Sequence, residues 1–117
     1  MRADLSTRYL GLELANPVVV SSTPATGRRE SLLEVAAAGA GAVVLPSLFE
    51  EEVLSGDAHL DGTGDHVALL RWAKQELDIP VIGSLNATKP GSWQRMANEL
   101  VDAGADALEL NLYTFTA

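Results

Sequence analysis

The sequence predicts an α/β fold built on four parallel β-strands that alternate with helices. Four short apolar segments recur along the chain, at residues 17–21, 42–45, 80–84 and 107–110. The first three are almost continuously apolar, which is typical of parallel strands covered on both faces. Segments with helical periodicity lie between them, so the order is βαβαβαβ, and connections of this kind are right-handed in nearly all proteins.

Three helices are expected between these strands, at residues 29–38, 65–77 and 92–103. In the last of them, apolar residues at helical spacing form a stripe made of Trp93, Met96, Ala97, Leu100 and Val101. We interpret this stripe as core and not as part of a cofactor site. Residues 5–14, before the first strand, alternate weakly between polar and apolar types and predict a small hairpin.

The ends of the expected helices carry capping signals. Asp65 and Ser92 are expected N-caps, because their side-chain oxygens can accept hydrogen bonds from free amides of the first turn. Gly39 and Gly104 directly follow two of the helices and suit the left-handed position that ends a helix before a strand.

An internal echo links two parts of the chain, because residues 38–45 match residues 103–110. Each copy reads as a helix end, a tight turn, small residues that allow close packing, and a strand. The two copies are separated by two βα units, as copies of a repeated module would be. The alternative is chance reuse of a favourable turn.

Composition limits the classes of partner. The 117 residues are expected to form a single domain over residues 1–117. The formal charge of −8 repels phosphate backbones and anionic lipid, so neither nucleic acid nor a membrane surface is an expected partner. The absence of cysteine excludes disulfides and thiolate metal sites and fits the cytoplasm. The sequence shows no signal peptide and no apolar run near the roughly 20 residues of a membrane span.

The carboxyl ends of all four expected strands carry polar residues, among them Ser22, Ser47, Asn86 and Asn111. Ligands of parallel α/β proteins bind at this edge of the sheet. A carboxamide donates and accepts hydrogen bonds without carrying charge, so Asn86 and Asn111 can hold the edge of a heteroaromatic ring or a carbonyl. The alternative is that each asparagine caps its own loop.

The loop after the second strand begins with three carboxylates, Glu50, Glu51 and Glu52. Successive side chains on a helix or strand point in different directions, so we expect a solvated face and no metal site. His66 lies on the apolar stripe of its helix and is expected to be partly buried with a hydrogen-bond partner. His59 lies in the loop and has no assigned role.

At several of these positions the chain resembles the dihydroorotate dehydrogenases. Residues 16–22 resemble their first strand, and residues 103–112 resemble their fourth strand and that of the pyrimidine-reducing domain of dihydropyrimidine dehydrogenase. Residues 45–51 and 84–88 are similar to a bacterial dihydroorotate dehydrogenase-like subgroup. The resemblance implies that residues 1–117 are the N-terminal half, about four βα units, of a TIM (β/α)8 barrel, with a short N-terminal hairpin.

The resemblance also implies an FMN-dependent oxidoreductase that acts on a CH–CH bond of a dihydropyrimidine-type substrate. FMN would lie at the carboxyl mouth of the barrel, with Ser22 near the flavin and Ser47 in contact with it. Asn111 would hydrogen-bond the flavin and the pyrimidine, and Asn86 would line the same mouth.

Several positions depart from the family pattern. Pro46 stands where members that oxidise dihydroorotate typically have a lysine, and Tyr113 and Thr114 stand where a cysteine or serine base is usual. The asparagine-containing substrate loop is not evident between Phe49 and Asp65. The lysine of strand 5 and the phosphate-binding loops after strands 7 and 8 lie beyond these four strands. The chain alone is therefore expected to be inactive and to bind FMN weakly or not at all.

Two alternatives stay open. The strands could form a small non-catalytic binding domain with an open flavodoxin-like sheet, or the chain could be a truncated gene product. Strand order separates the first alternative from the barrel, because a half barrel keeps the order 1-2-3-4 and a doubly wound sheet switches it.

Half a barrel leaves its outer strands as unpaired edges and its apolar inner face open. We therefore expect the 117-residue chain to be poorly soluble as a monomer, or to pair with a second half through these edges. Light scattering of the purified chain tests this expectation, and a stable, dispersed monomer would contradict it.

Overall fold

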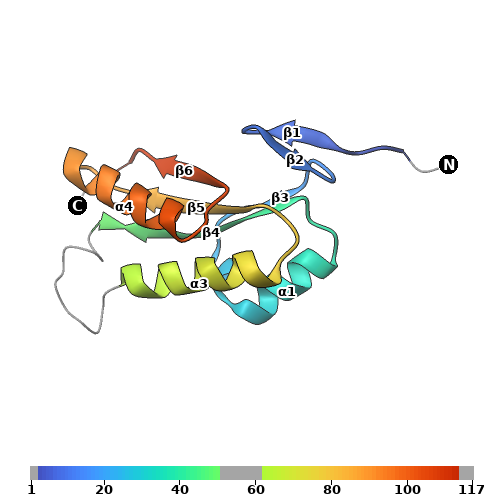
Figure 1. Cartoon of the computed structure of the whole chain (residues 1–117), viewed down its shortest axis with the longest axis horizontal. Coiled ribbons are helices and arrows are strands. Elements are labelled where there is room, and N and C mark those ends of the chain that lie inside the picture. Colours follow the sequence, from blue (N-terminus) through green and yellow to red (C-terminus); the bar gives the residue numbers. More distant parts are fainter. Residues whose placement is uncertain (1–2, 51–61, 114–117) are drawn as a thin grey trace.

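The computed structural model describes residues 3–50 and 62–113, and its larger sheet is parallel (Figure 1). The strands of this sheet are β3 (Val19–Val20), β4 (Ala42–Phe49), β5 (Val81–Asn86) and β6 (Ala107–Asn111). Their order is β3-β4-β5-β6, so neighbours in space are neighbours in sequence. This order is compatible with a partial α/β barrel and differs from the switched order of a doubly wound sheet.

Helices cover one face of this sheet. They are α1 (Arg29–Ala37), α3 (Gly62–Glu76) and α4 (Pro90–Asp102), and α3 contacts both of the others. The opposite face is covered in part by an N-terminal hairpin (Figure 1). The strands therefore have a cover on each face, but only one cover is helical. Within the described ranges, no helix is long and apolar enough to cross a membrane.

Alternation along the strands separates two apolar clusters. The cluster on the helical side includes Leu32, Val43, Leu45, Leu48, Leu70, Val81, Leu85, Met96 and Leu100. The smaller cluster, on the other face, consists of Leu14, Ala42, Val44 and Ile82. Full burial of an aliphatic side chain stabilises the fold by about 1.5–3 kcal/mol, so these clusters are the main source of stability. One residue of the predicted α4 stripe, Val101, is 53% exposed and lies outside the core.

The predicted hairpin is confirmed. It consists of β1 (Thr7–Tyr9) and β2 (Leu12–Leu14), which pair antiparallel. Leu10 and Gly11 connect them with φ angles of 54° and 75°. Two successive left-handed residues match the natural twist of a two-residue hairpin, and glycine adopts this conformation without steric cost. The hairpin places Leu14 against the second face of the sheet.

The C-terminal ends of α1 and α4 follow the prediction. Gly39 and Gly104 have φ angles of 95° and 108°. In the first turn, the Gly39 and Ala40 amides donate to the carbonyls of Ala36 and Val35, and the second turn repeats this pattern. This pair of hydrogen bonds defines the Schellman motif, which satisfies the last carbonyls of a helix.

The N-terminal predictions are wrong. Helix α3 begins at Gly62, so Asp65 lies inside its first turn and does not cap it. Helix α4 begins at Pro90 and is preceded by Lys89, so Ser92 is also inside the helix. Proline is favoured at the first helical position because it has no amide hydrogen to satisfy and its φ angle is already helical.

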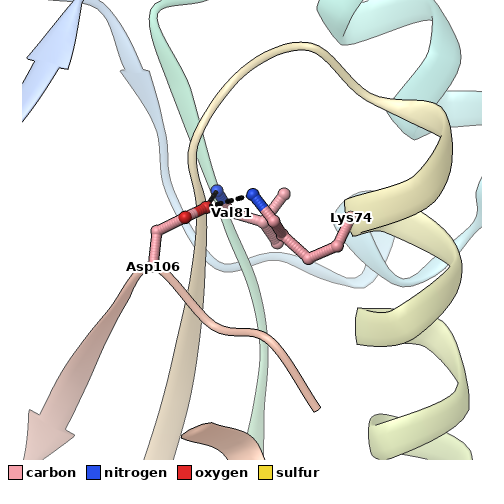
Figure 2. A network of polar contacts seen from close by, with 3 residues as sticks. All are labelled: Lys74, Val81 and Asp106. Carbon is pink, nitrogen blue, oxygen red and sulfur yellow. Dashed lines mark hydrogen bonds and ion pairs between the residues drawn. The ribbon is translucent and has the colours of Figure 1, made fainter. Parts of the chain in front are cut away.

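The two copies of the internal echo form the same helix–turn–strand unit and differ at one informative position. A side chain at Gly41 would overlap the backbone carbonyl oxygen of Asn16, which explains the glycine. At the matching position Asp106 has room for a carboxylate, whose Oδ2 accepts from Lys74 Nζ at 2.7 Å and from the Val81 amide at 2.8 Å (Figure 2). Asp106 therefore joins α3 to the starts of β5 and β6.

The close approach at Gly41 gives a stability prediction. Gly41→Ala is expected to lower the free energy of unfolding by about 3 kcal/mol, because backbone must move to admit the methyl group. Chemical denaturation of both proteins measures the difference. Gly91→Ala is the control, since open space surrounds this helical glycine and alanine there is expected to add up to about 1 kcal/mol. Equal stability of Gly41→Ala and the unsubstituted chain would contradict the prediction.

Candidate functional site

The carboxyl ends of β4, β5 and β6 bring four polar side chains together on the face opposite the helices. Ser47 Oγ lies 2.7 Å from Ser84 Oγ, and Ser84 Oγ donates to Glu109 Oε1 at 2.8 Å. Asn111 Nδ2 donates to Ser84 Oγ at 3.1 Å and to Ser47 Oγ at 3.2 Å. We call these four residues the rim network. It links three neighbouring strands through side chains.

The position of Ser47 depends on an irregularity in β4. The register pairs Val44 with Ile82 and Ser47 with Ser84, so two residues of β4 lie opposite one residue of β5. The extra residue reverses the alternation and turns Ser47 away from the helices. Pro46 lies within this irregularity, where its missing amide hydrogen costs no regular ladder bond.

An open hollow of about 420 Å³ lies beside the rim network. Its lining residues are Ser22, Thr23, Pro24, Pro46, Ser47, Phe49, Glu109, Asn111 and Tyr113. Three of the four residues predicted from the sequence, Ser22, Ser47 and Asn111, therefore border one space. Asn86 is the register partner of Asn111 and is 5% exposed, but it is not among the described residues that line the hollow.

Two residues of the rim network, Ser84 and Glu109, were not predicted as site residues from the sequence. Ser84 is almost completely buried, at 1% exposed, and Glu109 is partly exposed. Side chains two residues apart on a strand share a face, so Ser84 accompanies Asn86 and Glu109 accompanies Asn111. This alternation was the available signal in the sequence.

The polar side chains that line the hollow are uncharged, except for one carboxylate. Hydroxyl and amide groups can hold the polar edge of a neutral ring, because they donate and accept without charge. None of the described lining residues is basic, and Glu109 adds a carboxylate. The hollow therefore suits a neutral heterocycle better than a phosphate group.

A second polar cluster surrounds Glu50, which directly follows the end of β4. The prediction of a solvated face is wrong for Glu50, which is 3% exposed; Glu51 and Glu52 lie outside the described residues, as does His59. Glu50 Oε2 accepts from the amide and from the hydroxyl of Thr88, each at 2.8 Å. The Ser92 hydroxyl, followed by the two Thr88 groups, lowers the pKa of Glu50 to about 2. This carboxylate ties the end of β4 to the start of α4.

His66 behaves as predicted for a partly buried residue with a hydrogen-bond partner. Its Nε2 lies 3.2 Å from the backbone carbonyl oxygen of Ser47. The contact joins α3 to the irregular part of β4. We therefore assign His66 to the support of Ser47.

The known proteins found similar to the chain are described as dihydroorotate dehydrogenases. The chain is 34% identical over 126 residues to the "Dihydroorotate dehydrogenase B (NAD(+)), catalytic subunit" of Thermoplasma acidophilum, and 28% identical over 125 residues to the protein of the same description in Thermoplasma volcanium. Both matches cover 94% of the chain and 42% of the relative, so the chain spans about two fifths of their length.

A shorter match involves the "Putative dihydroorotate dehydrogenase A (fumarate)" of Aeropyrum pernix, with 46% identity over 44 residues. It covers 38% of the chain and 14% of that protein. No protein-family model matches the chain.

The hydrogen bonds of Glu50 predict a pH dependence of stability. The pKa falls from 4.5 to about 2 on folding, so the stabilisation is present above pH 4.5 and is lost as the pH falls toward 2. The stability advantage over Glu50→Gln should therefore shrink across this window, measured by urea denaturation at each pH. Thr88→Val removes one donor and should retain part of the pH dependence. Parallel pH profiles for the unsubstituted chain and Glu50→Gln would contradict the assignment.

Proposed function

We propose that the chain is a dihydroorotate dehydrogenase-like protein that corresponds to the N-terminal part of its relatives, and that it supplies the first four strands of an FMN-dependent (β/α)8-barrel oxidoreductase. Three features support the barrel: the sequential parallel order, the placement of α1, α3 and α4 on one face, and the hairpin on the other. In a (β/α)8 barrel the helices form the outer layer and the second face becomes the interior.

The proposed reaction is oxidation or reduction of a CH–CH bond in a dihydropyrimidine-type substrate, within pyrimidine metabolism. The observation that carries this proposal is the rim network, because it gathers neutral polar groups at the carboxyl ends of parallel strands, where barrel enzymes bind their ligands. Asn111 would hydrogen-bond the flavin and the pyrimidine, while Ser22 and Ser47 would contact the flavin. Asn86, beside Asn111 in the register, would line the same mouth.

The described residues fit one part of FMN. The hydroxyls of Ser22 and Ser47 and the amide of Asn111 match the polar edge of the isoalloxazine ring, which supplies an electron acceptor when bound. The same wall contains Glu109 and no basic residue among its described members, so it does not match the phosphate. We propose that phosphate binding depends on parts of the barrel outside this chain.

The proposed partners follow from the same comparison. The ligand is a small pyrimidine-like molecule, and neither nucleic acid nor membrane is proposed, given the charge of −8. We propose self-association of the chain through β3 and β6, which form the edges of the described sheet. The proposed location is the cytoplasm.

The function is tested on a longer version of the protein, which is extended through the downstream reading frame to the length of the relatives. We expect it to be yellow and its flavin to be reduced, without oxygen, by a compound of the dihydropyrimidine class. Asn111→Ala should weaken FMN binding about tenfold, which corresponds to one hydrogen bond of roughly 1.4 kcal/mol. The control is Gln94→Ala, which removes an exposed carboxamide from α4 and should leave binding unchanged.

The 117-residue chain provides the comparison. Titration with FMN, followed by flavin fluorescence, is expected to show weak binding because the phosphate has no anchor. Tight stoichiometric binding by this chain would contradict that expectation. A colourless longer protein that does not take up added FMN would contradict the proposed function itself.

A further inference from the structure

We propose that Glu109 is a positioning residue, whose carboxylate orients the Asn111 amide through the hydroxyls of Ser84 and Ser47. Its consequence is that Asn111 offers its carbonyl oxygen, and not its NH2 group, to a ligand in the hollow. The identity of that ligand rests on the proposed function. The orientation of the amide is argued from the hydrogen bonds of this chain alone.

The position of Glu109 is the first part of the argument. It lies in the middle of β6, and its register partner on β5 is Ser84. It lines the hollow at the rim and also a second hollow of about 460 Å³ between the sheet and the hairpin. A carboxylate at this point separates the apolar end of the inner face, near Val44 and Ile82, from its polar end.

Ser84 fixes the direction of the hydrogen bonds. A hydroxyl has one proton to donate and two lone pairs with which to accept. Because a carboxylate only accepts, the Ser84 proton must go to Glu109, at 2.8 Å. Ser84 must then accept from both of its other neighbours, Ser47 Oγ at 2.7 Å and Asn111 at 3.1 Å. The capacity of the Ser84 hydroxyl is then fully used.

The same reasoning continues to Asn111. Ser47 donates its proton to Ser84, so toward Asn111 it can only accept, at 3.2 Å. Both hydroxyls therefore require the NH2 end of the amide. The backbone carbonyl oxygen of Leu85 favours the same end, but at 3.4 Å it is the weakest of the three partners. The carbonyl oxygen of the amide is then the group left for a ligand.

This orientation selects the chemistry of the ligand. A carbonyl oxygen at the hollow accepts a hydrogen bond, so it favours a neutral ring that carries an N–H group, such as the imide N–H found in both pyrimidines and flavins. A ring methylated at that nitrogen would lose the hydrogen bond and leave a polar group unpaired.

The test follows the Asn111 side-chain amide by NMR in the ligand-free 117-residue chain. In the unsubstituted protein, its NH2 protons should show contacts to the β-protons of Ser47 and Ser84. Glu109→Met removes the acceptor, so these contacts should disappear and amide exchange with solvent should become about five- to tenfold faster. Glu109→Gln retains an acceptor oxygen and should preserve the contacts.

Controls separate positioning from general destabilisation. Glu76→Met removes the same charge from an exposed site at the end of α3 and should leave the Asn111 contacts intact. If Glu109→Met does not fold, Ser84→Ala cuts the same chain of hydrogen bonds with a smaller change and should also abolish the contacts. The proposal is overturned if a folded Glu109→Met or Ser84→Ala keeps the contacts, or if Glu109→Gln loses them as completely as Glu109→Met.

The two proposals fail in different ways. If the variants behave as expected but the longer protein binds no flavin, the positioning role stands and the proposed function falls. If the longer protein binds flavin while the amide is insensitive to Glu109, the function stands and the positioning role falls.

Discussion

The structure depends on the parallel pairing of β5 with β4 on one side and with β6 on the other. The registers align Ser84 with Ser47 and with Glu109, so residues far apart in sequence meet at one edge of the sheet. A shift of one residue in either pairing would turn these side chains toward the helices. The apolar clusters stabilise the register, because the same shift would bring apolar side chains out of the core.

Further interactions that hold this register lie at the amino-terminal ends of the strands. Asp106 connects α3, β5 and β6, and Asn16 serves the turn between α1 and β4 by donating from its Nδ2 to the Gly39 carbonyl oxygen at 2.6 Å. The ion pair of Asp106 with Lys74 is partly exposed, so we expect the hydrogen bond from the buried Val81 residue's amide to contribute more to stability. The hydrogen bonds of Asp106 and Asn16 thus lie at one end of the strands, and the rim network lies at the other.

Much of this architecture could be predicted from the sequence, for identifiable reasons. Continuous apolar runs predicted the strands, and glycines predicted the ends of α1 and α4, because both signals are local.

The N-caps could not be predicted correctly, since Pro90 competes with Ser92 for the start of α4. Glu50 is buried against Thr88, which is remote in sequence, so its hydrogen-bond partner could not be predicted. The adjacent Glu51 and Glu52 instead favoured the prediction of a solvated face. The proximity of Ser22, Ser47 and Asn111 followed from topology, whereas Ser84 and Glu109 required attention to strand alternation.

The proline in β4 limits how this part of the sheet can rearrange. An extra residue in a strand can in general migrate, because any amide along the ladder can take over the unpaired position. Pro46 has no amide hydrogen, so the ladder cannot close regularly through it and the irregularity is held at one place. Pro46 consequently favours the alignment of β4 with β5 in which the extra residue lies between Val44 and Ser47.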